Sequence, residues 1–532
     1  MRWLAESLLL LGFGPLFWAP FVYDDPAFIL RNPLVVGPWP GLRAYFLGSY
    51  FLGEYEPLNF LLHRALWHWG GDRVFLYRLS SLALHAGNAA LAYRIYKRRL
   101  GAPVTAWWTA LLVALYPGHV EALAVSVFKK HLLVAFFSLL SLNVQDSEAS
   151  DSGRAAGAAL CAALAVCCRE SAALLPALSL ALAWTRGRRD GVLIGAQCAV
   201  VALYAAVRLT LVPRHFQPLL EPTWTYHVLT CGKALLWDLG QLVLPTSISL
   251  EHSLGAVTTA LDGALVLAGL AALAFGLRLL RDDKVAVFGA AWTLIALFPT
   301  LGLVPFANYS AVANRYLYLA SFGFYLLWAR LAMRFVRRSL EAAGWSRVAP
   351  PLIAAATALG AIRASAMFCE PVALWRHAAE NAPSNPRAHG EFGRALQAAG
   401  ELPEAEAEYK KALALDPDYL WAYTGLSSLY SQLGRLDEAL ASARERVARR
   451  GDGDAYFALA VALAGGGRLK EARPAFEKAV SLDDQPRYRL YLGSCYEGLG
   501  LKEKAREQWQ LASKGGDPDV SARAGRSLAA LY

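Results

Sequence analysis

Long apolar segments fill the first 370 residues of this 532-residue chain and constrain its fold more than any other feature. A helix needs about 20 apolar residues to cross a bilayer, and backbone groups within lipid must be satisfied inside the helix. The sequence therefore predicts an all-α, polytopic membrane bundle of about eleven spans over residues 1–370. The segments lie at about residues 3–21, 74–95, 103–118, 131–144, 155–168, 171–184, 191–212, 257–277, 285–304, 316–334 and 348–368.

Clusters of Lys and Arg indicate which connections are cytoplasmic, because positively charged loops stay on that side. Residues 226–244 are interpreted as an interfacial or re-entrant helix, since they contain both Lys233 and Asp238. The first apolar run lacks a small-residue cleavage site and is interpreted as a retained span. An odd number of spans then places the first loop and the C-terminal region outside the cytoplasm. The clusters fall on every second connection, at residues 97–99, 186–189, 278–284 and 330–338.

The charge balance differs between the two parts of the chain. Residues 387–532 contain 21 Lys or Arg and 21 Asp or Glu, so the net charge of +10 falls on residues 1–386. This excess of positive charge indicates membrane topology. No nucleic-acid partner is expected. The seven cysteines show neither zinc-site spacing nor a disulfide framework. The sequence favours a multi-pass protein of a bacterial inner membrane, although an endoplasmic-reticulum protein would share the orientation.

Residues 371–532 repeat with a period near 34, which predicts a tetratricopeptide-repeat α-solenoid. The first full repeat fits this family best, at Gly393, Ala405, Tyr409, Ala412 and Pro417. Stacked helix pairs bury one continuous core and leave a concave face, which suits an extended acceptor peptide. Small alanines recur at Ala405, Ala439, Ala472 and Ala505, Ala443 departs from the pattern, and a partial repeat with Trp375, Ala378 and Pro383 precedes the array.

Two adjacent carboxylates, Asp24 and Asp25, follow the first apolar run in the segment FVYDDPAFILRN. Neighbouring carboxylates beside a membrane repel each other and lose hydration, so they need a cation, a hydrogen-bond donor or a function. A purely structural interpretation is that Asp25-Pro26 opens a turn and Asp24 caps the next segment. The same loop continues to Glu56, which adds acidic character over the outer leaflet.

Basic groups follow in later outer segments. His119 and Glu121 precede the pair Lys129 and Lys130, and cations on the outer side favour an anionic partner such as a lipid phosphate. The His119-x-Glu121 pattern lacks the spacing of a helical zinc site. Two further charged positions, Arg169-Glu170 and Arg315, allow either a binding role or simple snorkelling at the interface.

The ordered series of these motifs resembles one known family. FVYDDPAFILRNPLV, YEPLNFLLHRALW, YPGHVEALAVSVFKKHLL, CRESAALLPA, ISLEHSLG and ANRYLYLASFGF, followed by the repeats, are similar to the transmembrane-and-tetratricopeptide O-mannosyltransferases and their bacterial relatives. The resemblance covers nearly the whole chain. It implies the C-type membrane glycosyltransferase fold.

The resemblance also implies transfer of a hexose, mannose in the family, from a polyprenyl-phosphate donor to Ser or Thr of a protein outside the cytoplasm. No cofactor is implied, and a divalent metal is left open. The implied roles are as follows: Asp24 or Asp25 takes the acceptor proton, Lys129, Lys130, Arg315 and Arg169 bind the lipid phosphate, and His119, Glu121, Glu170 and Glu56 support them.

Four departures from the family pattern bear on the donor: His131 and Asn314 replace usual acids, and Pro26 and Ala27 stand where relatives often have further acids. Two other classes of function remain open. A non-catalytic scaffold would use the repeats to recruit envelope proteins, and a transporter or lipid flippase would need more charge at mid-span. The glycosyltransferase hypothesis predicts that Asp24 and Asp25 lie near Lys130 and Arg315, across the space of one sugar and one phosphate.

Overall fold

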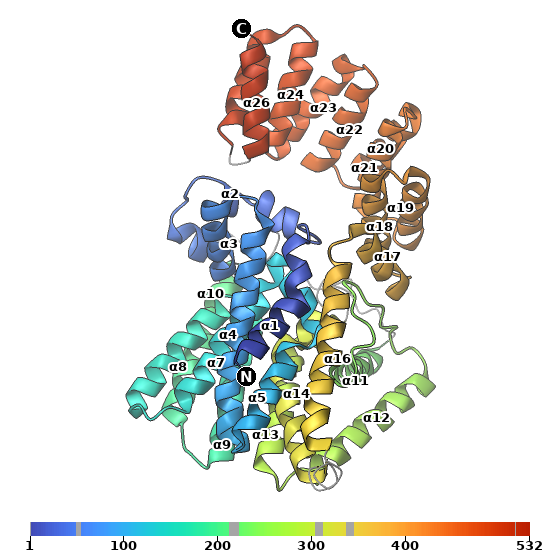
Figure 1. Ribbon diagram of the computed structural model, residues 1–532. Helices are drawn as coiled ribbons and strands as arrows, with labels where there is room; N and C mark the ends of the chain where they lie inside the picture. The colour runs from blue at the N-terminus through green and yellow to red at the C-terminus, as the bar shows by residue number, and fades with distance from the viewer. Residues whose placement is uncertain are drawn as a thin grey trace. The chain divides into compact units, whose positions relative to one another are not determined.

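The computed structural model describes residues 2–48, 55–211, 223–303, 312–336, 345–515 and 518–531. All regular elements in these ranges are helical, as the sequence predicts. The chain divides into two compact units, which Figure 1 colours by residue number. The first unit comprises Met1–Ile29 and Pro40–Glu370, and the second comprises Leu30–Trp39 and Pro371–Tyr532.

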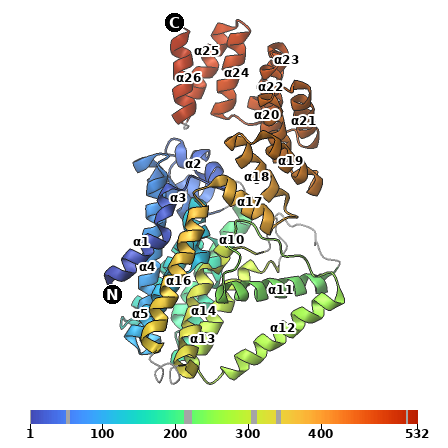
Figure 2. The same cartoon turned by 45° about the vertical axis from the view of Figure 1, so that its right-hand side comes forward.

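The first unit is a bundle of helices. In both Figure 1 and Figure 2, α4, α5, α14 and α16 run alongside one another. Local sequence explains the helix boundaries. Gly101 caps the end of α4 with a left-handed φ of 65°, a conformation that glycine adopts without the steric cost of a Cβ. Pro103 then begins α5. The helices are α1 (Arg2–Phe13), α3 (Pro57–Gly70), α4 (Val74–Leu100), α5 (Pro103–Ala114), α6 (Val120–Ala124), α7 (Lys129–Gln145), α8 (Asp151–Val166), α9 (Leu175–Arg186), α10 (Gly191–Leu211), α11 (Trp224–Val243), α12 (Ala260–Leu279), α13 (Lys284–Leu297), α14 (Leu317–Leu331) and α16 (Trp345–Met367).

Three described helices are long and apolar enough to cross a membrane: Ser126–Gln145, Gly191–Thr210 and Ala260–Leu279. A broken helix pair brings the number to four if it is counted as one span. Other apolar helices are shorter; α5 has 12 residues, and at 1.5 Å per residue it extends about 18 Å, short of the roughly 30 Å of hydrocarbon. The bundle of about eleven spans therefore stays a prediction.

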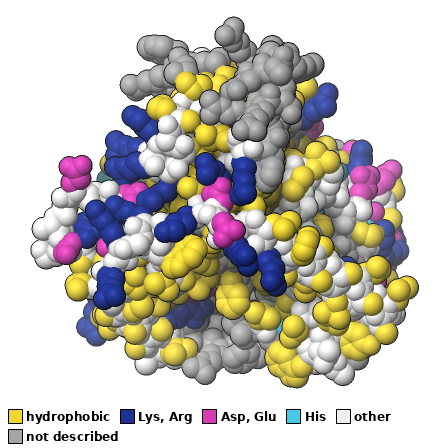
Figure 3. Space-filling view, turned by 90° about the horizontal axis from the view of Figure 1, so that it is seen from below, with side chains coloured by type: hydrophobic (Ala, Val, Ile, Leu, Met, Phe, Trp, Pro, Cys, Tyr) yellow, Lys and Arg dark blue, Asp and Glu magenta, His cyan; other side chains and the backbone are white. Residues whose placement is uncertain are grey.

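One end of the first unit collects basic side chains from connections predicted to be cytoplasmic. Asp146, after α7, forms ion pairs with Arg99 at 2.5 Å and Arg186 at 2.8 Å, which joins the ends of α4, α7 and α9. Arg330 of α14 contacts Asp283, before α13, at 2.8 Å. Figure 3 views the molecule from this end and shows many Lys and Arg side chains among hydrophobic ones.

The second unit stacks α-helices in antiparallel pairs. The four predicted alanines are fully buried where paired helices cross, as expected from their spacing. Glycines with left-handed φ recur in the turns, at Gly400, Gly434, Gly467 and Gly500. The helices are α17 (Pro371–Asn381), α18 (Pro386–Ala399), α19 (Leu402–Leu415), α20 (Leu420–Gln432), α21 (Leu436–Arg449), α22 (Gly453–Gly465), α23 (Leu469–Leu482), α24 (Pro486–Gly498), α25 (Lys502–Ser513) and α26 (Pro518–Ala530), and α2 (Pro33–Val36) groups with them.

Candidate functional site

Asp25 is fully buried in the first unit and contacts two distant segments. Its Oδ1 accepts a hydrogen bond of 2.9 Å from the Val127 backbone N–H, before α7. Its Oδ2 lies 3.7 Å from Arg78 Nη1 of α4. Arg78 also donates to the Ser126 hydroxyl at 2.7 Å and to the Pro20 carbonyl at 2.6 Å. The guanidinium therefore compensates the buried carboxylate and ties the first loop to α4 and α7.

Tyr23 gives the aspartate loop an unusual backbone conformation. Its φ of 59° is the only positive value among the described non-glycine residues. Such a conformation costs on the order of 1–3 kcal/mol and persists where surrounding contacts impose it. Here the Tyr23 hydroxyl donates to Glu251 at 2.8 Å, and its ring lies 5.4 Å from that of Phe128. These contacts hold the turn that presents Asp24 and Asp25.

A second buried ion pair joins the start of α3 to α7. Lys130 Nζ lies 2.6 Å from Glu56 Oε1, and both side chains are almost wholly buried. Asn59 donates to the other Glu56 oxygen at 3.0 Å. His63 contacts the carbonyls of Asn59 and Ser126, at 2.7 Å and 3.0 Å. This network therefore fixes the start of α3 beside the segment that binds Asp25.

A third buried pair links α6 to the segment before α14. The Arg315 guanidinium contacts the Glu121 carboxylate, which also accepts a hydrogen bond of 2.8 Å from the Arg315 backbone N–H. Arg315 lies against three aromatic rings, with centroids 4.5 Å away for Phe128, 5.0 Å for Tyr316 and 5.8 Å for Tyr23. The contact with Tyr23 places this pair beside the aspartate loop.

Burial changes the acid–base properties of the carboxyl groups. It raises the pKa of Asp25 above the usual range, while the Arg78 guanidinium and the Val127 N–H oppose that shift. Burial likewise raises the pKa of Glu121, and the Arg315 guanidinium opposes it. Asp24, by contrast, is half-buried. Of the two adjacent aspartates, Asp24 is thus the better placed to meet a substrate.

Two of the other predicted site residues are core residues in this structure. Lys129 is fully buried, and its ammonium donates to the Tyr77 carbonyl at 2.8 Å and the Ser81 hydroxyl at 2.5 Å, both on α4. His119 is buried among aromatic rings and contacts the Ser321 hydroxyl at 2.9 Å. The positive charge of Lys129 lies close enough to Asp25 to act on its carboxylate. The roles of Lys129 and His119 that the sequence suggests stay predictions.

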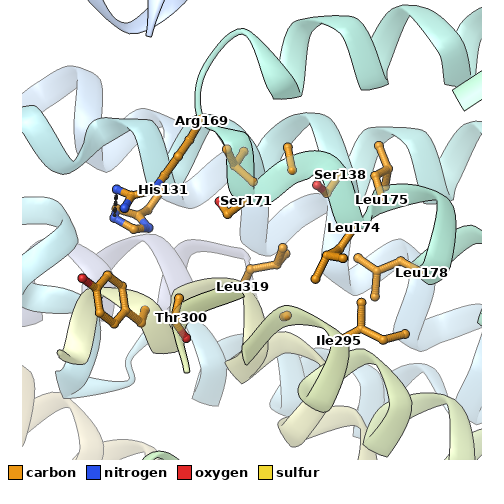
Figure 4. Close-up of a pocket in the computed structure, with 14 residues that line it drawn as sticks. His131, Ser138, Arg169, Ser171, Leu174, Leu175, Leu178, Ile295, Thr300 and Leu319 are labelled. Carbon is orange, nitrogen blue, oxygen red and sulfur yellow. Dashed lines mark hydrogen bonds between the residues drawn. The ribbon is translucent and has the colours of Figure 1, made fainter. Parts of the chain in front are cut away.

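Arg169 lines a hollow between α7, α9, α13 and α14, and half-buried Glu170 follows it at the start of a short 3-10 helix. Arg169 donates to His131 Nε2 at 3.2 Å. Figure 4 shows this pair at one end of the hollow and the side chains of Leu178 and Ile295 at the other. The hollow therefore has a basic end and an apolar end.

Sequence reasoning missed Arg78, Tyr23 and Glu251. Arg78 had a detectable signal, because a charged residue within an apolar segment marks a paired or functional position. Glu251 lies in the ISLEHSLG motif, whose sequence alone indicates no role for it. Nothing in the sequence indicates the left-handed backbone of Tyr23. Among the described residues, no three His, Cys, Asp or Glu side chains gather as a metal site.

Comparisons with known proteins identify the second unit. Family models of the tetratricopeptide repeat match residues 396–464, 453–486, and 372–419 together with 472–521. The matched ranges extend from residue 372 to residue 521. The second unit is a tetratricopeptide-repeat domain.

Two curated relatives extend the comparison. The chain is 22% identical over 436 residues to Protein O-mannosyl-transferase F38B6.6 of Caenorhabditis elegans, covering 75% of this chain and 60% of that protein. It is 34% identical over 161 residues to Cellulose synthase operon protein C of Xanthomonas axonopodis pv. citri, covering 28% of this chain and 10% of that protein. The chain thus spans less than two thirds of either relative.

Solved structures of repeat proteins also match. The tetratricopeptide-repeat protein TTC0263 of Thermus thermophilus is 24% identical and matches 32% of this chain and 92% of its own, with a TM-score of 0.29. YrrB, described as a tetratricopeptide-repeat protein with an unusual peptide-binding site, is 26% identical and matches 29% of this chain and 82% of its own, with a TM-score of 0.24.

Proposed function

We propose that the protein is an integral-membrane glycosyltransferase that moves a hexose from a polyprenyl phosphate to a hydroxyl group of a protein. The observation that carries the proposal is the set of three buried ion pairs, Asp25–Arg78, Glu56–Lys130 and Glu121–Arg315, which join distant segments at and beside the loop of Asp24 and Asp25. The similarity to the Caenorhabditis elegans O-mannosyl-transferase over 75% of this chain supports it.

The two aspartates take different roles in this proposal. Asp24 is the general base, because its half-buried carboxylate can meet an acceptor hydroxyl. Asp25 is a positioning residue, because its carboxylate is occupied by Arg78 and the Val127 N–H and has no exposed surface. The contacts of Tyr23 hold the backbone turn from which the Asp24 side chain extends.

The reaction is a direct displacement at the anomeric carbon. The acceptor oxygen forms a bond to that carbon, the bond from the carbon to the phosphate oxygen breaks, and its electron pair leaves with the prenyl phosphate. The hydroxyl proton passes to Asp24. Positive charge at the leaving phosphate stabilises the transition state, and in this proposal Arg169 at the hollow and Arg315 against the Tyr23 ring supply it.

The repeats supply the acceptor in this proposal. Tetratricopeptide helices form a concave face that suits an extended peptide, and the chain has this domain directly after its first unit. The orientation that the basic clusters predict places both the aspartates and the repeats outside the cytoplasm. A bacterial inner membrane fits this arrangement, with the repeats in the periplasm.

Mass spectrometry of envelope glycopeptides from cells tests the proposed function. Cells with the wild-type chain are expected to contain hexosylated Ser or Thr peptides that disappear when Asp24 and Asp25 are both replaced by Asn. Unchanged glycopeptides in the double variant would reject the proposal. Immunoblotting for the full-length chain in the membrane fraction controls for loss of the protein.

A membrane-anchored scaffold is the second candidate function. The repeat matches over residues 372–521 favour it, because such domains commonly recruit partners without catalysis. It does not account for three buried ion pairs between loops far apart in sequence. Retained envelope assembly in the double aspartate variant, together with unchanged glycopeptides, would support the scaffold.

A further inference from the structure

We propose that residues 244–259, which connect α11 to α12, form a latch that positions the proposed base, with Glu251 and His252 as its two positioning residues. Glu251 holds the turn that carries Asp24, and His252 holds the segment that carries Arg315. The inference rests on the proposed function, since it takes Asp24 as the base. It gives a role to the ISLEHSLG motif, none of whose residues takes part in the proposed displacement.

The latch segment is buried where an ordinary connection would be exposed. Residues 244–259 form neither helix nor strand, and such connections usually run over the surface of a protein. A buried carboxylate and a buried imidazole lose hydration, so each needs hydrogen-bond partners. Both have partners on segments far away in the sequence. The four successive residues Ser249, Leu250, Glu251 and His252 are at most 5% exposed.

Glu251 contacts the turn that carries Asp24. The Tyr23 hydroxyl donates to Glu251 Oε1 at 2.8 Å, across 228 residues of sequence. Tyr23 has the left-handed φ of 59°, a conformation that persists only where contacts impose it. The turn that follows is closed by the backbone N–H groups of Ala27 and Phe28, which donate to the Asp24 carbonyl at 3.1 Å and 3.0 Å. The bond to Glu251 therefore acts on the residue that begins this turn.

His252 contacts the segment before α14 through a closed ring of hydrogen bonds. Its Nε2 lies 2.5 Å from Asn314 Oδ1, and Asn314 Nδ2 donates to the Ser247 carbonyl at 3.1 Å. The Ser247 hydroxyl lies 3.3 Å from His252 Nδ1 and completes the ring. A neutral imidazole with its proton on Nε2 satisfies every contact. Asn314 has no exposed surface, and its amide both accepts and donates, so the ring depends on an amide at this position.

The two contacts of the latch segment meet at Arg315. Asn314 directly precedes Arg315, whose guanidinium lies 5.8 Å from the centre of the Tyr23 ring. The Phe128 ring packs on both groups, with its centroid 5.4 Å from that of Tyr23 and 4.5 Å from the guanidinium. Successive residues of the latch segment thus bind two segments that also contact each other. The latch segment therefore sets the place of the Asp24 turn relative to Arg315.

Hydrogen–deuterium exchange of the full chain in detergent tests the latch without requiring catalysis. The amide protons of Ala27 and Phe28 report on the turn, because both are bonded to the Asp24 carbonyl. Glu251→Leu and Tyr23→Phe each remove the hydrogen bond between these two side chains. Each variant is expected to speed exchange of the peptide that covers the turn about fivefold, the factor that one hydrogen bond provides.

Matched variants separate the hydrogen bond from charge and from general stability. Glu251→Gln keeps an oxygen that accepts from the Tyr23 hydroxyl, so it should show wild-type exchange. The double variant Tyr23→Phe and Glu251→Leu should exchange no faster than either single variant, because both changes remove the same bond. Thr258→Val, at an exposed position of the latch segment, is the control and should change nothing. Buried Cys168 should stay protected from thiol labelling in every variant.

Two measurements extend the test to Arg315 and to catalysis. Asn314→Leu breaks the ring with His252 and should speed exchange at Tyr316, whose N–H is bonded to the Ala313 carbonyl at 3.0 Å. Glu251→Leu should lower the single-turnover rate of sugar transfer about fivefold in the wild-type chain. It should cause no further loss in Asp24→Asn, because the latch acts through Asp24.

Four results would overturn the inference: unchanged exchange of the turn in both single variants, additive effects in the double variant, equally fast exchange in Glu251→Gln and Glu251→Leu, or loss of Cys168 protection in Tyr23→Phe. The outcome is separable from that of the proposed function. Exchange as expected in a chain that transfers no sugar would support the latch and reject the transferase. Sugar transfer with unchanged exchange in these variants would do the reverse.

Discussion

Ion pairs are built differently in the two units of this protein. The pairs at and beside the aspartate loop of the first unit are buried and distant: Glu121 and Arg315 are 194 residues apart, and their side chains are 1% and 9% exposed. In the repeats, pairs such as Arg468–Glu471 are one helical turn apart and about half exposed. Exposed pairs contribute little to stability, whereas a buried charge without its partner is strongly destabilising. Loss of one partner should therefore matter more at the buried pairs beside the aspartate loop than at exposed pairs of the repeats such as Arg468–Glu471.

The largest expected effect comes from breaking a buried pair. Glu121→Gln leaves the Arg315 charge uncompensated and should destabilise the first unit by about 3–5 kcal/mol. Thiol labelling during thermal unfolding in detergent can monitor each unit separately. Buried Cys168 reports on unfolding of the first unit, and buried Cys495 reports on the second. Labelling of Cys168 should begin at lower temperature and that of Cys495 should not change.

Glu471→Gln is the matched control, since it removes an exposed partner from the repeats. It should leave both cysteines as protected as in the wild type. An equal shift in the two variants would contradict the contrast between buried and exposed pairs.

This contrast also explains what the sequence can predict. The repeats were predictable because their signals are local: Ala405, Ala439, Ala472 and Ala505 recur with the period of one helix pair, and the structure buries all four. The residues of the site were predictable in type but not in pairing. Arg315 was expected to bind the donor phosphate with Glu121 in support, and the structure shows that these two side chains contact each other.

The neighbours Lys129 and Lys130 show a second limit of sequence reasoning. Successive residues of a helix point about 100° apart. Lys130 therefore meets Glu56, while Lys129 faces Tyr77 and Ser81 of α4. Two adjacent lysines in a motif do not reveal which one faces the site. The φ of Tyr23 is also set by tertiary contacts and has no sequence signal.

A packing change in the repeats should have an intermediate effect. A Cβ at Gly425 would lie 2.4 Å from the Tyr409 ring, which also lies against Gly393. Gly425→Ala should therefore destabilise the second unit by about 1–3 kcal/mol. The measurable result is labelling of Cys495 at a lower temperature than in the wild type. Gly465→Ala, with no atom within 4 Å of the new Cβ, is the control and should slightly increase stability. Earlier labelling of Cys168 in the Gly425 variant would argue against independent units.

The smallest expected effect is a pH dependence of the repeats. Hydrogen bonds from Lys410, then Tyr430 and Arg435, lower the pKa of Glu406 from 4.5 to about 2. A carboxylate with a lowered folded-state pKa adds stability above its unfolded pKa and loses it as pH falls through the folded value. Protection of Cys495 should therefore decline from pH 4.5 toward pH 2, and less steeply in Glu406→Gln. Identical pH profiles for the two chains would exclude this contribution.

In the proposed mechanism, buried charges from distant loops hold the loop that presents one carboxylate, Asp24, to the acceptor hydroxyl. The decisive experiment measures single-turnover transfer from a polyprenyl-phosphate hexose to a Ser/Thr peptide. It compares the purified wild-type chain with Asp24→Asn, Asp25→Asn and the exposed control Asp72→Asn. We expect Asp24→Asn to lower the rate at least about 100-fold without changing Cys168 protection. We expect Asp25→Asn to lower both the rate and the protection, and Asp72→Asn to change neither. Transfer at the wild-type rate by Asp24→Asn would show that Asp24 is not the base.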